Sequence, residues 1–128
     1  MAKILLDSGL LIRHLRNHQP TVQLIRALGS TERLAISVIT RLELKMGMHT
    51  EERYKTQKFL TRFTCYEIDT RIADQTGELI YRLQSEGQGI SIPDAVIAVT
   101  ALAYRLTLVT YNRAHFEIVP GLSLYKFP

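Results

Sequence analysis

The chain lacks several features that would assign it to familiar classes of protein. It has one cysteine, Cys65, no tryptophan and four prolines in 128 residues. A single cysteine excludes an internal disulfide and fits a reducing, cytoplasmic compartment, where we expect it to be a small buried residue. No run approaches the ~18 apolar residues of a membrane span. Because Asp7 interrupts the first apolar run, we expect no secretory signal either.

Motifs for common cofactors and nucleophiles are also missing. The sequence has neither the glycine-rich loops that cradle nucleotide phosphates nor the turn that presents a nucleophilic serine in hydrolases. The histidines lie on unrelated segments, so they give no zinc-ligand spacing and we expect them on the surface. They are His14, His18, His49 and His115.

The composition that remains is that of one globular α/β domain covering residues 1–128. Hydrophobic residues make up 46% of the chain and charged residues 22%. The net charge is +4 and is unevenly distributed. Residues 1–62 hold eleven Lys and Arg against five Asp and Glu, and residues 63–128 hold five against seven. This asymmetry indicates a basic face for an acidic partner, although a solvated surface without a partner explains it too.

Apolar segments with strand character alternate with segments of helical periodicity. Such alternation is typical of a parallel sheet with helices on both faces. Ligands of these sheets bind at the carboxyl ends of the strands. The expected strands are 3–7, 34–38, 65–68, 106–110 and 122–127. The expected helices are 10–15, 20–28, 39–48, 50–63, 72–87 and 93–106.

Three acids stand where apolar residues would be expected. Asp7 ends the first strand, Glu43 shares a helical stripe with Leu42 and Met46, and Asp94 follows Pro93 at the start of an apolar helix. A buried carboxylate is costly unless it is paired or binds a cation. Structural roles explain each acid singly: a helix N-cap for Asp7, a buried ion pair for Glu43 and a favourable helix terminus for Asp94.

Taken together, the acids suggest a shared divalent cation. Mg²⁺ and Mn²⁺ prefer carboxylate and water oxygens, and their usual chemistry is phosphodiester hydrolysis. Asn112 follows the strand that ends at Thr110, so it is either a turn residue or a fourth member of the site.

Four segments, in order, resemble the PIN-domain nucleases, and in particular the toxin subunits of VapBC toxin–antitoxin pairs. They are Leu5-Leu6-Asp7-Ser8, the stretch 37–44 (SVITRLEL), Asp94-Ala95-Val96-Ile97-Ala98 and Leu108-Val109-Thr110-Tyr111-Asn112. The resemblance spans almost the whole chain. It implies a PIN-like three-layer α/β/α fold with a central parallel sheet.

The resemblance also implies a function and a set of site residues. It implies a Mg²⁺- or Mn²⁺-dependent endoribonuclease toxin, neutralised by a cognate antitoxin and assembled as a homodimer. Asp7, Glu43, Asp94 and Asn112 would be catalytic, with Asp7 and Asp94 on the metal, and Ser8 and Thr110 would support them. The family often has Asp where this chain has Asn112.

The basic residues nearest these motifs are candidates for contacts with RNA phosphates. They are Arg13, Arg16, Arg41, Lys45 and Arg113. Two other functions stay open at this point. One is a PIN-type nuclease of RNA processing or DNA repair that has no antitoxin, and the other is a metal-free module that binds nucleic acid or protein.

Overall fold

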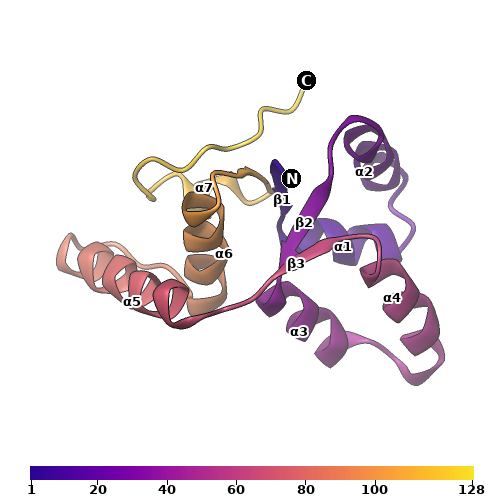
Figure 1. The fold of residues 1–128 in the computed structure, drawn as a ribbon, viewed down its shortest axis with the longest axis horizontal. Coiled ribbons are helices and arrows are strands. Elements are labelled where there is room, and N and C mark those ends of the chain that lie inside the picture. Colours follow the sequence, from indigo (N-terminus) through magenta and orange to yellow (C-terminus); the bar gives the residue numbers. More distant parts are fainter.

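The computed structural model describes all 128 residues and contains one four-stranded sheet surrounded by helices (Figure 1). The strands are β1 (Ile4–Leu6), β2 (Leu34–Ser37), β3 (Thr64–Tyr66) and β4 (Thr107–Val109). The helices are α1 (Ser8–Leu15), α2 (Gln19–Thr31), α3 (Val38–Gly47), the 3-10 turn η1 (Thr50–Glu52), α4 (Arg53–Leu60), α5 (Thr70–Ser85), α6 (Ile92–Ala103) and α7 (Arg113–Phe116).

The sheet is entirely parallel and has the order β3-β2-β1-β4. From β1 the chain builds outward through β2 and β3, and it then returns to add β4 on the other side of β1. The winding direction therefore reverses between β1 and β4. In open α/β sheets this reversal leaves a crevice at the carboxyl ends of the two strands, which is the usual place for a ligand.

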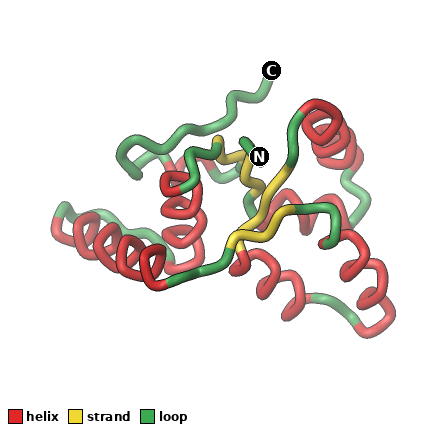
Figure 2. The backbone as a smooth tube through the Cα atoms, in the orientation of Figure 1, coloured by secondary structure: helices red, strands yellow, loops and turns green.

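Both faces of the sheet are buried, as expected for parallel strands. Ile4 and Leu6 point into an apolar core shared with α1, α2 and α4, whereas Leu5 points into a second core with α6 and the C-terminal segment. Helix α5 packs on the outside of α6 (Figures 1 and 2). The predicted α/β/α architecture is confirmed.

Two predicted elements differ from those observed. The helix expected over 50–63 is divided into η1 and α4. The strand expected over 122–127 is reduced to one parallel bridge, Leu108 to Leu124. Instead of forming a strand, the end of the chain packs an aromatic ring on the protein. Phe127 stacks on Tyr111, with 5.3 Å between the ring centroids. No helix is long and apolar enough to cross a membrane.

Candidate active site

Asp7 lies at the carboxyl end of β1 and is also the N-cap of α1. Its carboxylate oxygen Oδ1 accepts the Ser8 amide at 2.8 Å, and Oδ2 accepts the Thr110 hydroxyl at 2.7 Å. Its own amide donates to the carbonyl of Val109 at 3.0 Å. The carboxylate is 5% exposed. Asp7 does cap α1, as considered from the sequence, but the cap uses only one of its two carboxylate oxygens.

The surroundings of Asp7 disfavour its negative charge. Burial raises the pKa of the Asp7 carboxyl, the hydrogen bonds from Thr110 and Ser8 lower it, and the charges of Asp94 and Glu43 raise it. Both acids therefore act electrostatically on Asp7. We refer to Asp7, Glu43 and Asp94 as the acidic cluster. Its mutual repulsion would be relieved by a cation.

Glu43 reaches the acidic cluster from α3 through a chain of hydroxyl groups. The Ser8 hydroxyl donates to Glu43 Oε1 at 2.7 Å and lies 2.9 Å from the Thr40 hydroxyl. Ser8 has one hydroxyl proton and a carboxylate can only accept, so Thr40 must be the donor to Ser8. The two helices α1 and α3 are thereby joined beside Asp7.

The reasoning that placed Glu43 on a buried helix face was wrong, although its position is as expected. Leu42 is 51% exposed and Met46 is 78% exposed, so the stripe they share with Glu43 is not the buried face. The buried residues of α3 are Thr40 and Leu44. Glu43 turns inward because Ser8 supplies a hydrogen-bond donor, and apolar packing does not explain its orientation.

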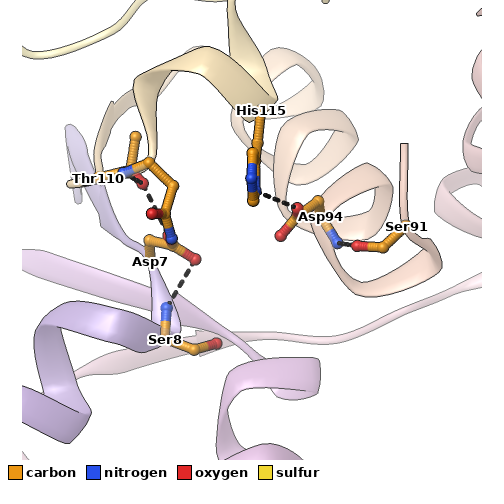
Figure 3. A network of polar contacts seen from close by, with 7 residues as sticks. Asp7, Ser8, Ser91, Asp94, Thr110 and His115 are labelled. Atoms are coloured by element: carbon orange, nitrogen blue, oxygen red, sulfur yellow. Dashed lines mark hydrogen bonds and ion pairs between the residues drawn. The ribbon is translucent and has the colours of Figure 1, made fainter. Parts of the chain in front are cut away.

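Asp94 stands in the first turn of α6, where Ser91 is the N-cap. The Ser91 hydroxyl accepts the Asp94 amide at 3.2 Å, which fixes the start of the helix. Asp94 Oδ2 is 3.3 Å from Nδ1 of His115. Figure 3 shows that the Asp94 and Asp7 carboxylates are turned toward the same space, while His115 approaches Asp94 from α7. A cavity of 480 Å³ opens beside Asp94 and His115.

Asn112 lies three residues after the end of β4, and its side chain makes no hydrogen bond within the protein. It is the N-cap residue of α7 without a side-chain cap. Its backbone amide donates to the Thr110 hydroxyl at 2.9 Å. The same hydroxyl donates to Asp7, so Thr110 connects the turn at Asn112 to the acidic cluster. The Asn112 side chain is exposed and therefore free to turn toward a ligand.

The acidic cluster offers only oxygen donors, which suit Mg²⁺ or Mn²⁺ rather than zinc. No three His, Cys, Asp or Glu side chains converge closely enough to ligate one ion directly. Mg²⁺ usually retains several waters and takes only one or two carboxylates from the protein. The donor set therefore fits such an ion when part of its contacts pass through water.

The predicted phosphate-binding residues differ in whether their cationic groups already contact other residues of the protein. Arg113 donates to the carbonyl of Tyr125 at 2.9 Å and pairs with Glu117 at 3.5 Å. The guanidinium of Arg13 lies over the Tyr111 ring, 4.3 Å from its centroid. Arg41 and Lys45 both donate to Gln57. Arg16 lines a small cavity together with Glu43.

Two residues did not behave as the sequence suggested. His14 was expected on the surface, but its ring stacks on Phe59 at 4.2 Å and its Nδ1 is buried without a partner. Cys65 was expected to be buried, yet it is only half-buried, and burial raises the pKa of its thiol. The contact of His115 with Asp94 was missed, because nothing local to either residue brings α7 onto the start of α6.

Comparison with known proteins places this geometry in a family. The PIN domain family model matches residues 4–122. Ribonuclease VapC10 of Mycobacterium tuberculosis is 34% identical over 120 residues, which cover 94% of this chain and 90% of that protein. The tRNA(fMet)-specific endonuclease VapC of Salmonella typhimurium is 30% identical, and the alignment covers 97% of each chain.

Solved structures agree with the sequence relatives. The VapBC2 complex of Rickettsia felis, bound to a DNA fragment from its promoter, has a chain that superposes with a TM-score of 0.85 at 27% identity, covering 98% of both chains. The DNA-bound VapBC of Salmonella typhimurium gives the same TM-score at 29% identity. Matched along nearly its whole length in sequence and in fold, this chain belongs to the PIN-domain family, among the VapC proteins.

Proposed function

We propose that this protein is a Mg²⁺- or Mn²⁺-dependent endoribonuclease, the toxin of a toxin–antitoxin pair acting in the cytoplasm. The observation that supports the proposal is the buried Asp7 carboxylate at the carboxyl end of β1, on which the charges of Asp94 and Glu43 act. The relatives named above are ribonucleases, and the solved neighbours are toxin–antitoxin complexes. These similarities favour the toxin over a processing or repair nuclease and over a metal-free binding module.

Each residue of the site has a role that follows from its contacts. Asp7 and Asp94 would hold the cation, which when bound supplies charge neutralisation at a phosphoryl oxygen and a more acidic water. Thr110 and Ser8 keep the Asp7 carboxylate in one orientation. Glu43 is oriented by Ser8, so its free oxygen remains available to accept a proton. Asn112 would present its amide to the cation or the scissile phosphate.

The proposed partners follow from the same similarities. The antitoxin would lie over α1, α3 and α4 at the small cavity that Ile12, Leu15, Leu44 and Met48 line beside Glu43. Leu11 is fully buried and cannot contact it. We further propose a homodimer. Light scattering at micromolar concentration checks this assembly, and a monomer would contradict it.

A metal titration tests the site without relying on activity. A ligand that binds only the folded state stabilises it by mass action, by ~2.7 kcal/mol at 100 times its dissociation constant. Millimolar Mn²⁺ should therefore raise the melting temperature of the wild type by several degrees above its value in chelator. Asp94→Asn should lose much of this shift, whereas Arg71→Gln, an exposed change on α5, should keep it. Absence of a shift in the wild type would remove the metal site.

Mapping of cleaved cellular RNA ends tests the activity. After expression of the wild type, new ends should appear at defined positions in cellular RNA, and co-expression of the cognate antitoxin should suppress them. The Asp94→Asn variant is the control. Equal patterns of RNA ends for the wild type and the variant would contradict an endoribonuclease with this site.

A further inference from the structure

A second cavity, of 570 Å³, lies between the end of α1 and the outer face of α4. We call it the α1–α4 cavity. Three of its lining residues are the cations Lys55, Lys58 and Arg62, which lie three and four positions apart and so share one face of the helix and the turn after it. No carboxylate lines it.

These cations are not neutralised by the protein. No Asp or Glu side chain lies within salt-bridge distance of Lys55, Lys58 or Arg62, although ion pairs occur elsewhere on the surface. Arg62 instead lies over the Phe59 ring, 5.5 Å from its centroid. A group of like charges without counter-charges destabilises the isolated protein, and an anionic ligand would relieve that repulsion.

The lowered pKa of His14 shows that several of these positive charges act on the same wall of the cavity. Its ring belongs to the cavity wall and stacks on Phe59. Burial lowers the pKa of His14, and the charges of Arg62, Lys55 and Arg26 lower it further. The imidazole is therefore kept neutral, with Nδ1 buried and unpartnered, among cations from α2 and α4. The field in this cavity is positive, in contrast to the acidic cluster.

The cavity also carries an exposed aromatic ring. Tyr54 is 78% exposed and belongs to the same wall as the cations. Cations that follow a phosphate backbone, combined with aromatic side chains on which bases stack, are the ordinary means of holding single-stranded nucleic acid. An acidic peptide would use the cations but would gain less from a free tyrosine ring. The chemistry of the wall therefore favours RNA.

The position of the cavity suits a strand that also reaches the acidic cluster. Helix α1 begins at Ser8 beside Asp7, and its end forms part of the cavity. His14 lies ~9 Å further along the helix axis than Ser8, at ~1.5 Å per residue. That separation is within the reach of a few nucleotides of an extended strand.

We propose that the α1–α4 cavity is an RNA subsite, in which Lys55, Lys58 and Arg62 bind backbone phosphates and Tyr54 stacks on a base of the same strand that is cleaved at the acidic cluster. None of these residues was among the phosphate contacts predicted from the sequence. The inference rests on the proposed ribonuclease function and adds a second point of contact for its substrate.

The test measures RNA binding separately from cleavage. Fluorescence anisotropy follows a labelled single-stranded RNA on the full-length protein, in excess EDTA so that no cleavage occurs, over a range of salt concentrations. For single strands, each phosphate contact contributes ~0.7 to the slope of log affinity against log salt. The double variant Lys55→Gln/Lys58→Gln should have a slope shallower by ~1.4 and an affinity lower by an order of magnitude at ~0.1 M salt.

Two further variants distinguish RNA binding at the subsite from a general electrostatic attraction between RNA and a basic protein. Arg53→Gln/Arg71→Gln removes two exposed cations that do not line the cavity, and it should keep most of the wild-type slope. Tyr54→Ala should weaken binding about tenfold with the slope unchanged, because stacking involves no counterion release. All these positions are exposed, so the melting temperatures should match the wild type within a few degrees.

The outcomes distinguish this subsite from the proposed function. A wild type that cleaves RNA, with equal slopes for the wild type and Lys55→Gln/Lys58→Gln, would overturn the subsite alone. The subsite would also be overturned if that variant bound RNA normally but lost the antitoxin, since the cavity would then serve a protein partner. A wild type that neither binds nor cleaves RNA would overturn both proposals.

Discussion

Asp7 and Asp94 belong to the same acidic cluster, but the protein holds them in different ways. Asp7 is 5% exposed, accepts hydrogen bonds on both carboxylate oxygens and directly follows the central strand β1. The Asp94 side chain is 23% exposed, opens onto a cavity and is contacted only by His115, itself 62% exposed. One side of the site is built into the sheet, while the other can adjust to what binds. The proposed catalysis by a cation shared between them would need both sides.

The largest expected effect is the loss of activity when either acid is neutralised. Asp7→Asn and Asp94→Asn should each lower RNA cleavage by on the order of 100-fold or more, because each removes a charge placed to stabilise the reaction electrostatically. Cleavage of a defined RNA under single-turnover conditions measures this. His115→Ala is the comparison variant and should cost much less. Wild-type cleavage by either Asn variant would remove that acid from the site.

The hydrogen bonds that Thr110 makes to Asp7 and Ser91 makes to Asp94 should contribute unequally to the free energy of unfolding. Thr110→Val removes a buried donor from a carboxylate and should destabilise the fold by ~1.5–3 kcal/mol. It should also raise the pKa of Asp7 further, since the Thr110 hydrogen bond lowers it. Ser91→Ala removes only the cap of α6 and should cost ~1 kcal/mol. Chemical denaturation in chelator measures both, and an equal cost would contradict the distinction between the two sides.

A pH series tests the burial of Asp7 directly. Because its pKa is raised in the folded state, the charged form destabilises the fold, and this loss is complete only above the folded-state pKa. In chelator, Asp7→Asn should therefore be more stable than the wild type at neutral pH. The difference should shrink as the pH falls and vanish below ~4, near the ordinary pKa of aspartate. A constant difference across pH would show that the charge is not its cause.

The smallest effect concerns Asn112. If its side chain lies beside the cation, Asn112→Asp adds a fourth negative charge there. Metal affinity should then rise with the number of charged ligands, and stability in chelator should fall slightly through repulsion. Melting temperatures of both proteins in chelator and in Mn²⁺ measure the two shifts. Equal metal-induced shifts would identify Asn112 as a turn residue only.

Sequence patterns predicted the four strands of the sheet and the closeness of Asp7 to Thr110 because these depend on local order. Asp7 and Thr110 each follow an apolar strand, and neighbouring parallel strands bring such residues to one edge. The hydroxyl link from Ser8 to Thr40 and Glu43 joins residues 32 and 35 positions apart, so no local pattern reveals it. The apolar stripe of Leu42 and Met46 misled the prediction because helical periodicity alone cannot say whether such a stripe faces the core, and here both side chains are exposed.

The amide of Asp7 donates to the carbonyl of Val109, so the site is tied to the pairing of β1 with the edge strand β4. Such an amide exchanges its hydrogen with solvent when this pairing opens. The carboxylate of Asp7 therefore keeps its place as long as β1 and β4 remain paired. The Asp94 side depends instead on α7 and the first turn of α6, so a rearrangement there would leave the anchor at Asp7 in place.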